Sequence, residues 1–120
     1  MITNGPIAYG DASCSTWTAA GGLIFLGHHG GGYEQDDVAQ QVAAAVDGLA
    51  ATLAQAGAGL EHLTKVTLYL RDIADFEAAR DALARALPPG VRPARMTATT
   101  DFVDPGARCQ IDGIAVLPGT

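Results

Sequence analysis

The chain has little positive charge, and this shortage argues against several classes of partner. It carries 7 Lys and Arg residues against 13 Asp and Glu, which gives a formal net charge of −6. Lys65 is its only lysine, and the arginines form no run along the sequence. Binding to nucleic acids or anionic membranes depends mainly on clustered Lys and Arg side chains. We therefore expect neither nucleic acid nor a membrane among the partners.

Long apolar runs, a basic leader and paired cysteines are also missing. No apolar stretch approaches the roughly 20 residues that a membrane-spanning helix needs, and residues 1–6 do not look like a secretory signal. Cys14 and Cys109 lie far apart and match neither a CxxC nor a zinc pattern. We expect two free thiols, Cys14 most simply buried and inert, in a reducing cytoplasm.

Hydrophobic residues make up 48% of the chain, which is enough for one folded domain over residues 1–120. Their spacing predicts two helices. After Asp36 or Asp37, which can cap a helix, an apolar stripe continues to Gly57 with a helical period. Its members are Val38, Val42, Val46, Leu49, Leu53 and Ala56. A second stripe stops at Pro88 and contains Phe76, Ala79, Leu83 and Leu87.

Other segments favour strands. Residues 65–70 alternate between apolar and polar, so one side of this strand is buried. The apolar run 23–26, ended by Gly27, predicts a buried strand. Residues 95–100 and 109–116 read as strands, and residues 13–18 are a weaker candidate. The element order predicts a two-layer α+β fold, with two helices on one face of a mostly antiparallel sheet. The uncovered face favours a symmetric oligomer.

Several motifs carry a family resemblance. The stretch 56–76 resembles the long central signature of the RidA/YjgF proteins, and residues 21–25 resemble their second strand. Pro93-Ala94-Arg95 is similar to their "PAR" motif, and residues 110–115 are similar to their "EIEAIA". The likeness covers residues 13–117 in order. It implies a homotrimer with a site in each cleft between subunits. It also implies hydrolysis of reactive imines and enamines such as 2-aminoacrylate, without a metal or an organic cofactor.

The resemblance assigns a role to Arg95, which matches the arginine that holds the substrate carboxylate. A guanidinium group suits this role because its planar fork can bind a carboxylate with two hydrogen bonds. Thr97 lies two residues further on, where the family uses backbone groups to hold ligand and water.

Gln110 is a departure from the family pattern, because it occupies the position of the catalytic glutamate. A glutamate can accept a proton from water and return it to the leaving nitrogen, whereas a glutamine can only orient water or substrate. Asp112 shares the face of Gln110 on an extended strand. We interpret it as a solvated or paired carboxylate.

Three further positions differ from the family at the expected pocket. Cys14 stands where a tyrosine is usual, and Gly27 and His28 alter the rim after the second strand. His28 and His29 are adjacent on a strand, so they point to opposite faces and are poorly placed to chelate one ion. We expect no metal site. A surface histidine is the default interpretation of each, and a single pocket histidine that donates a hydrogen bond or acts as a base is the alternative. Cys14, Gly27 and His28 are therefore candidate substrate-binding residues.

Two functions follow. The first is a RidA-like enzyme that acts on a small carboxylate-bearing imine or enamine. The alternative is a non-catalytic trimeric module that binds a small carboxylate ligand, and Gln110 favours it. A ribonuclease activity disagrees with the acidic charge.

Overall fold

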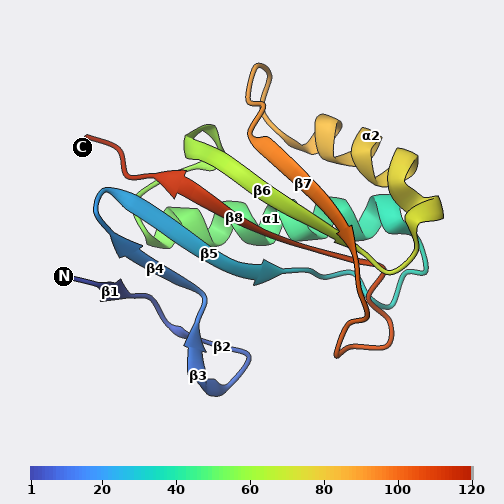
Figure 1. Ribbon diagram of the computed structural model, residues 1–120, viewed down its shortest axis with the longest axis horizontal. Helices are drawn as coiled ribbons and strands as arrows, with labels where there is room; N and C mark the ends of the chain where they lie inside the picture. Colours follow the sequence, from blue (N-terminus) through green and yellow to red (C-terminus); the bar gives the residue numbers. More distant parts are fainter. Residues whose placement is uncertain (120) are drawn as a thin grey trace.

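The computed structural model describes residues 1–119. Its main sheet has six strands in the order β1-β4-β5-β8-β6-β7 (Figure 1). Only β6 and β7 are parallel, and the other neighbouring pairs are antiparallel. The strands are β1 (Thr3–Asn4), β4 (Trp17–Ala20), β5 (Leu23–His29), β6 (Leu63–Leu70), β7 (Ala94–Thr99) and β8 (Cys109–Val116). A separate hairpin is formed by β2 (Ile7–Ala8) and β3 (Asp11–Ser15).

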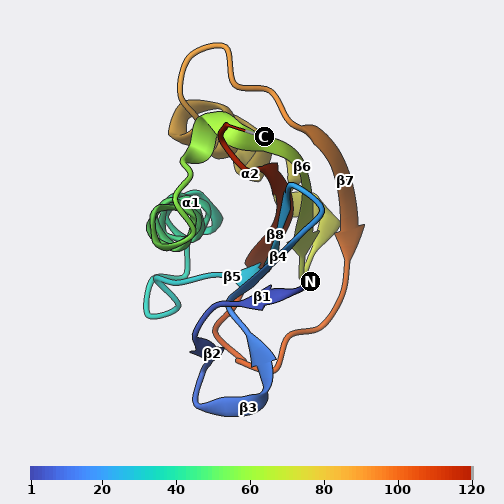
Figure 2. The same ribbon diagram turned by 90° about the vertical axis from the view of Figure 1, so that its left-hand side faces the viewer.

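Both α-helices, α1 (Val38–Gln55) and α2 (Phe76–Ala86), lie on one face of the sheet (Figure 2). The 3₁₀ turns η1 (Leu60–His62) and η2 (Ile73–Asp75) lead into β6 and α2. The predicted fold class is confirmed. Asp37 is the N-cap of α1, because its side chain accepts a hydrogen bond from the amide of Gln40 at 3.2 Å. Within residues 1–119 no helix has both the length and the apolar character for crossing a bilayer.

The core lies between the helices and the sheet. The α1 stripe supplies five side chains of at most 6% exposure, and every second residue of β6 and β8 points toward them. Burial of one such aliphatic side chain stabilises the fold by about 1.5–3 kcal/mol. The largest fully buried members include Ile24, Leu49, Leu53, Leu68, Leu70 and Ile111.

The prediction for residues 23–26 needs two corrections. The strand does not end at Gly27 but continues to His29, and its pairing with β8 shifts register between Leu26 and His29. Nor is it buried on both faces, because Leu23 and Phe25 keep 37% and 41% of their surface exposed. The helices cover one face of the sheet only, so an unbroken apolar run does not imply burial on both sides. The short strands β1 and β2 were not predicted, since two residues carry no periodic signal.

Gln41 is a fully buried polar residue that joins α1 to the start of β8. Its Nε2 donates to the carbonyl oxygens of Gln35 at 2.9 Å and Gly106 at 3.0 Å, and its Oε1 accepts from the amide of Arg108 at 2.7 Å. Both Nε2 hydrogens and the Oε1 atom of Gln41 therefore have backbone partners. Arg71 also holds the loop before β8, because its guanidinium donates to the carbonyl oxygens of Ala107 at 2.8 Å and Asp104 at 3.1 Å. These two side chains position the start of β8.

We expect Gln41→Leu to lower the free energy of unfolding by about 2–4 kcal/mol, since each buried backbone group left without a partner costs about 1–3 kcal/mol. Chemical denaturation measures the change. Gln40→Leu is the matched control, because Gln40 is exposed and surface substitutions usually change stability by less than about 0.5 kcal/mol. Equal stability of the two variants would contradict the role of Gln41.

Candidate functional site

The face of the sheet without helices, here called the open face, has a depression of about 330 Å³ beside Gln110. Gln110 and Asp112 point to this face, because the residues that alternate with them on β8 are fully buried on the helix side. Tyr69 lies opposite Gln110 in the register of β6 and β8. His28 and residues 100–103 complete the lining. The depression therefore brings together a carboxamide, two carboxylates, a phenol and an imidazole.

Hydrogen bonds fix two of these groups. The Nε2 of Gln110 donates to the hydroxyl of Tyr33 at 3.1 Å, and burial raises the pKa of that phenol, so it stays protonated at neutral pH. The hydroxyl of Tyr69 donates to Oδ2 of Asp112 at 3.2 Å. Asp112 is thus a paired carboxylate, as we interpreted it. Gln110 keeps its carbonyl oxygen as an acceptor that can orient water.

Tyr9 is a residue that the sequence analysis missed. Its ring stacks on that of His28, with centroids 4.9 Å apart, and its hydroxyl donates to the His28 carbonyl at 2.6 Å. Tyr9 has a φ of +55°, a left-handed conformation that is uncommon outside glycine. Burial raises the pKa of Tyr9, and the nearby Tyr33 and Cys14 raise it further. The signal was weak, because only a non-periodic turn brings Tyr9 to this place.

Cys14 and Gly27 lie near the same rim. Cys14 is exposed on β3, so the expectation of a buried thiol is wrong. The reason is that β3 belongs to a separate hairpin, which adds no strand to the main sheet. Gly27 contacts the chain between β3 and β4: its amide donates to the Thr16 carbonyl at 3.0 Å, and an added Cβ would lie in ordinary contact, 3.4 Å from the Ser15 carbonyl oxygen.

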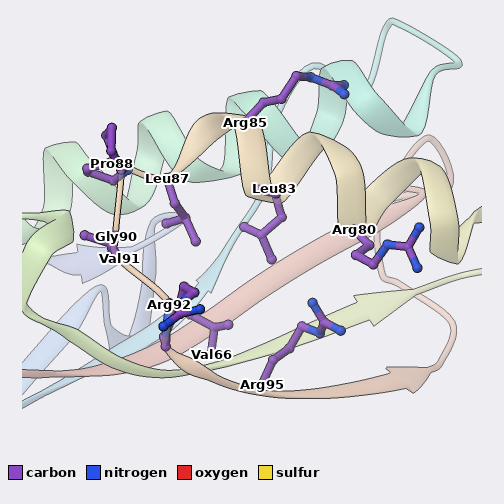
Figure 3. A pocket seen from close by; sticks show the side chains of 13 residues that line it. Val66, Arg80, Leu83, Arg85, Leu87, Pro88, Gly90, Val91, Arg92 and Arg95 are labelled. Atoms are coloured by element: carbon purple, nitrogen blue, oxygen red, sulfur yellow. The ribbon is translucent and has the colours of Figure 1, made fainter.

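Arg95 and Thr97 lie on the other face of the sheet. In the parallel register of β6 and β7, Arg95 pairs with Val66 and Thr97 with Leu68, and both partners are buried under the helices. The Arg95 side chain points toward α2 (Figure 3), and its Cζ lies 5.5 Å from the centre of the Phe76 ring. It forms no ion pair with a carboxylate among residues 1–119. A guanidinium without an acidic partner is available to an anionic ligand.

Arg95 and Gln110 are consequently not together in one subunit. Tyr69 of β6 pairs with Gln110 on one side and with Ala98 on the other. Gln110 therefore lies two strands away from β7, at a level three residues beyond Arg95. Strand geometry then places their Cα atoms roughly 14 Å apart, with the side chains on opposite faces. A substrate of three or four carbon atoms cannot contact both residues within one chain.

Cys109 and His29 have structural positions. Burial raises the pKa of Cys109 to about 12, so this thiol is protonated and a poor nucleophile at neutral pH. His29 is buried, against the expectation of a surface histidine, because the bulge in β5 turns it toward α1. Its Nδ1 donates to the Gly27 carbonyl at 2.7 Å, and its Nε2 lies 2.7 Å from the Thr52 hydroxyl, which therefore donates to it.

No three His, Cys, Asp or Glu side chains in the described part of the chain are grouped so that they could hold a metal ion. The depression itself offers hydrogen-bonding side chains and two carboxylates, Asp101 and Asp112.

Comparison with known proteins identifies the family. The profile of the family described as Endoribonuclease L-PSP, which is the RidA/YjgF family, matches residues 11–117. The chain belongs to this family. Among curated RidA/YjgF relatives, protein DfrA of Myxococcus xanthus is 33% identical over 68% of this chain, and the match spans 62% of the length of DfrA. The mitochondrial protein mmf2 of Schizosaccharomyces pombe is 32% identical over 80% of this chain and 81% of its own.

Solved structures share the fold. A member of the YjgF protein family from Neisseria meningitidis superposes with a TM-score of 0.90 at 24% identity, covering 100% of this chain and 98% of the other. A member of the YjgF/YER057c/UK114 family from Mycobacterium tuberculosis gives a TM-score of 0.84 at 23% identity, covering 98% and 100%. At these identities the RidA/YjgF structures support the fold and not the choice of substrate.

The environment of His29 predicts a pH-dependent stability. Burial lowers the pKa of His29 from its ordinary value of 6.5. Below about pH 6.5 the unfolded chain therefore takes up a proton that the native state does not, and the free energy of unfolding falls by up to about 1.4 kcal/mol per pH unit. Urea denaturation between pH 7.5 and 5.5 measures this slope. His29→Gln should flatten it, and His28→Gln, at an exposed position, should keep it. An unchanged slope in His29→Gln would show that other groups cause the loss.

Proposed function

We propose that the protein hydrolyses a small carboxylate-bearing imine or enamine in clefts between identical subunits, acting as one domain in the cytoplasm and without a metal or organic cofactor. The observation that carries this proposal is the state of Arg95. Its guanidinium lies at the edge of the sheet against Phe76 and pairs with no carboxylate of the described chain. An arginine in this state is suited to the carboxylate of a substrate.

The separation of Arg95 from Gln110 favours a site shared by two subunits. The two residues lie on opposite faces, so a site that uses both needs Arg95 of one subunit and Gln110 of the partner subunit. The open face is suited to association because it leaves apolar side chains in water, among them Leu23, Phe25 and Val116 at 37–41% exposure. A homotrimer, as in the family resemblance, would cover this face and build one cleft per pair of subunits.

The reaction moves both protons of the attacking water to the nitrogen. The water loses one proton as it adds to the imine carbon and the nitrogen takes one up, which gives a carbinolamine. The second proton passes from the carbinolamine hydroxyl to the nitrogen as the C–N bond breaks, so that a keto acid and ammonia form. Gln110 can hold the attacking water through its carbonyl oxygen, but it cannot accept a proton. Water itself or a carboxylate of the same depression, Asp101 or Asp112, must relay these protons. Because general acid–base catalysis contributes roughly 10²–10⁴ in rate, we expect slow turnover. Cys14, Gly27, His28 and the backbone at Thr97 would shape the pocket.

Gln110 also favours a second function, a non-catalytic module that binds a small carboxylate ligand. Such a module would keep Arg95 and need no titrating group at position 110. The family description names an endoribonuclease, but the net charge of −6 disfavours RNA as the substrate.

We expect the protein to assemble as a trimer. Light scattering in dilute solution should give a mass about three times the 12.2 kDa of one chain, because the open face needs cover. Phe25→Asp, which places a charge on that face, should shift the mass toward the monomer. A wild-type protein that scatters as a monomer would contradict the shared cleft.

A glutamate at position 110 restores the titrating group that Gln110 lacks. Gln110→Glu should raise the rate of keto-acid release from 2-aminoacrylate generated in the assay by about 10², because glutamate is nearly isosteric and can carry the proton. The hydrogen bond to Tyr33 then reverses, with the phenol as donor.

The matched control is the double variant Gln110→Glu with Arg95→Ala. It should lose the gain, because the reacting carbon is no longer held by the carboxylate. A folded Gln110→Glu variant that is no faster than wild type would favour the binding module, provided that wild type still binds the carboxylate through Arg95.

A further inference from the structure

A groove of about 620 Å³ runs between α2, β7 and the loop 87–93 that joins them (Figure 3). Its floor is aliphatic. Four side chains form it, from β6, α2 and the loop: Val66, Leu83, Leu87 and Val91. Its lining contains no Asp or Glu. The volume lies within the range of about 300–1,000 Å³ that is usual for small-molecule sites, and it is much more than an acid of two or three carbon atoms fills.

Four arginines border this groove in a chain whose net charge is −6. Arg80 and Arg85 come from α2, Arg92 from the loop and Arg95 from β7. In Figure 3 Arg80 and Arg95 extend toward the same end of the groove. No local sequence pattern predicts this cluster, because 15 residues separate Arg80 from Arg95 and only the β6–β7 crossover brings them together.

The Phe76 ring lies against two of these arginines. The Cζ atoms of Arg80 and Arg95 lie 5.6 Å and 5.5 Å from the centre of the Phe76 ring. Two guanidinium groups on one ring repel each other, and an anion between them removes that repulsion. The ion pair of Arg80 with its neighbour Asp81, at 3.2 Å, is largely solvent-exposed and therefore weak. It does not compete strongly with a ligand.

We propose that the groove binds an amphipathic organic acid, with its carboxylate between Arg80 and Arg95 and an aliphatic tail of several carbon atoms along the floor. Arg80 is then a second anion-binding residue. The inference rests on the role of Arg95 in the proposed function and adds the rest of the ligand: the substrate carries an aliphatic chain. A hydrophilic anion such as inorganic phosphate would leave the aliphatic floor in water, and a neutral hydrocarbon would leave the guanidinium groups unpaired.

Calorimetry with simple probes tests the assignment on the intact protein. Octanoate should bind at least about a hundredfold more tightly than acetate, since each buried methylene contributes about fourfold. Octylamine, which has the same tail and the opposite charge, should not bind. Arg80→Gln should weaken octanoate binding at least about tenfold. Lys65→Gln is the control, because it also removes one positive charge, from an exposed side chain that does not line the groove.

A variant of the floor completes the test. Val91→Asp places a carboxylate in the loop where the tail lies, and it should abolish octanoate binding while circular dichroism shows the native fold. The inference is wrong if octanoate and acetate bind alike, if neither binds, or if Arg80→Gln and Lys65→Gln weaken octanoate equally.

Failure of this inference and failure of the hydrolase proposal give different results. Arg80-dependent binding of octanoate without keto-acid release by wild type or Gln110→Glu would keep the groove and reject the hydrolase. Keto-acid release that depends on Arg95, with no preference for longer acids and no effect of Arg80→Gln, would keep the hydrolase and reject the groove.

Discussion

The three hydrogen bonds of Gln41 fix where β8 enters the sheet, and much of the molecule depends on that entry. The loop that Gln41 holds ends at Arg108, whose guanidinium pairs with Asp75 at 2.9 Å and Asp36 at 2.8 Å. Those carboxylates precede α2 and α1, so one short segment connects both helices to the central strand. The pairing of β8 with β5 and β6 then sets which residues face the helices and which face outward. A slip of one residue would bury Gln110 and Asp112 and expose Cys109 and Ile111.

The sequence predicted what depends on local spacing. The limits of β8 and the buried stripe of α1 follow from short-range patterns, and Asp37 is one of the two caps that the sequence offered for α1. The family and fold class are confirmed. The sequence could not predict that Arg95 and Gln110 lie on opposite faces of the sheet. That depends on β7 lying parallel beside β6, a pairing between segments about 30 residues apart. Tyr9 was missed for a similar reason, because its contact with His28 crosses 19 residues through an irregular turn.

Family membership and local chemistry give separate information about this chain. RidA/YjgF relatives and structures support the fold over nearly the whole length. The residues of the proposed reaction are distributed over two faces. Cys14, Gly27, His28 and Gln110, which depart from the family pattern that the sequence resembles, lie on or beside the open face, whereas Arg95 and its "PAR" context lie on the helix side. In the proposed function, the anion-binding part is kept and the part that handles water and protons is changed.

The arginine at position 95 is carried by an edge strand of the sheet. β7 ends the sheet and pairs with β6 alone, whereas β8 is paired on both sides. Opening of β7 breaks one ladder of hydrogen bonds and leaves the rest of the sheet intact, so it needs less free energy than opening of β8. A ligand that joins Arg95 to α2 adds a second attachment for this strand. Ligand binding therefore stabilises β7 against local opening. The slowing of amide exchange along β7 then measures ligand affinity without any chemical turnover.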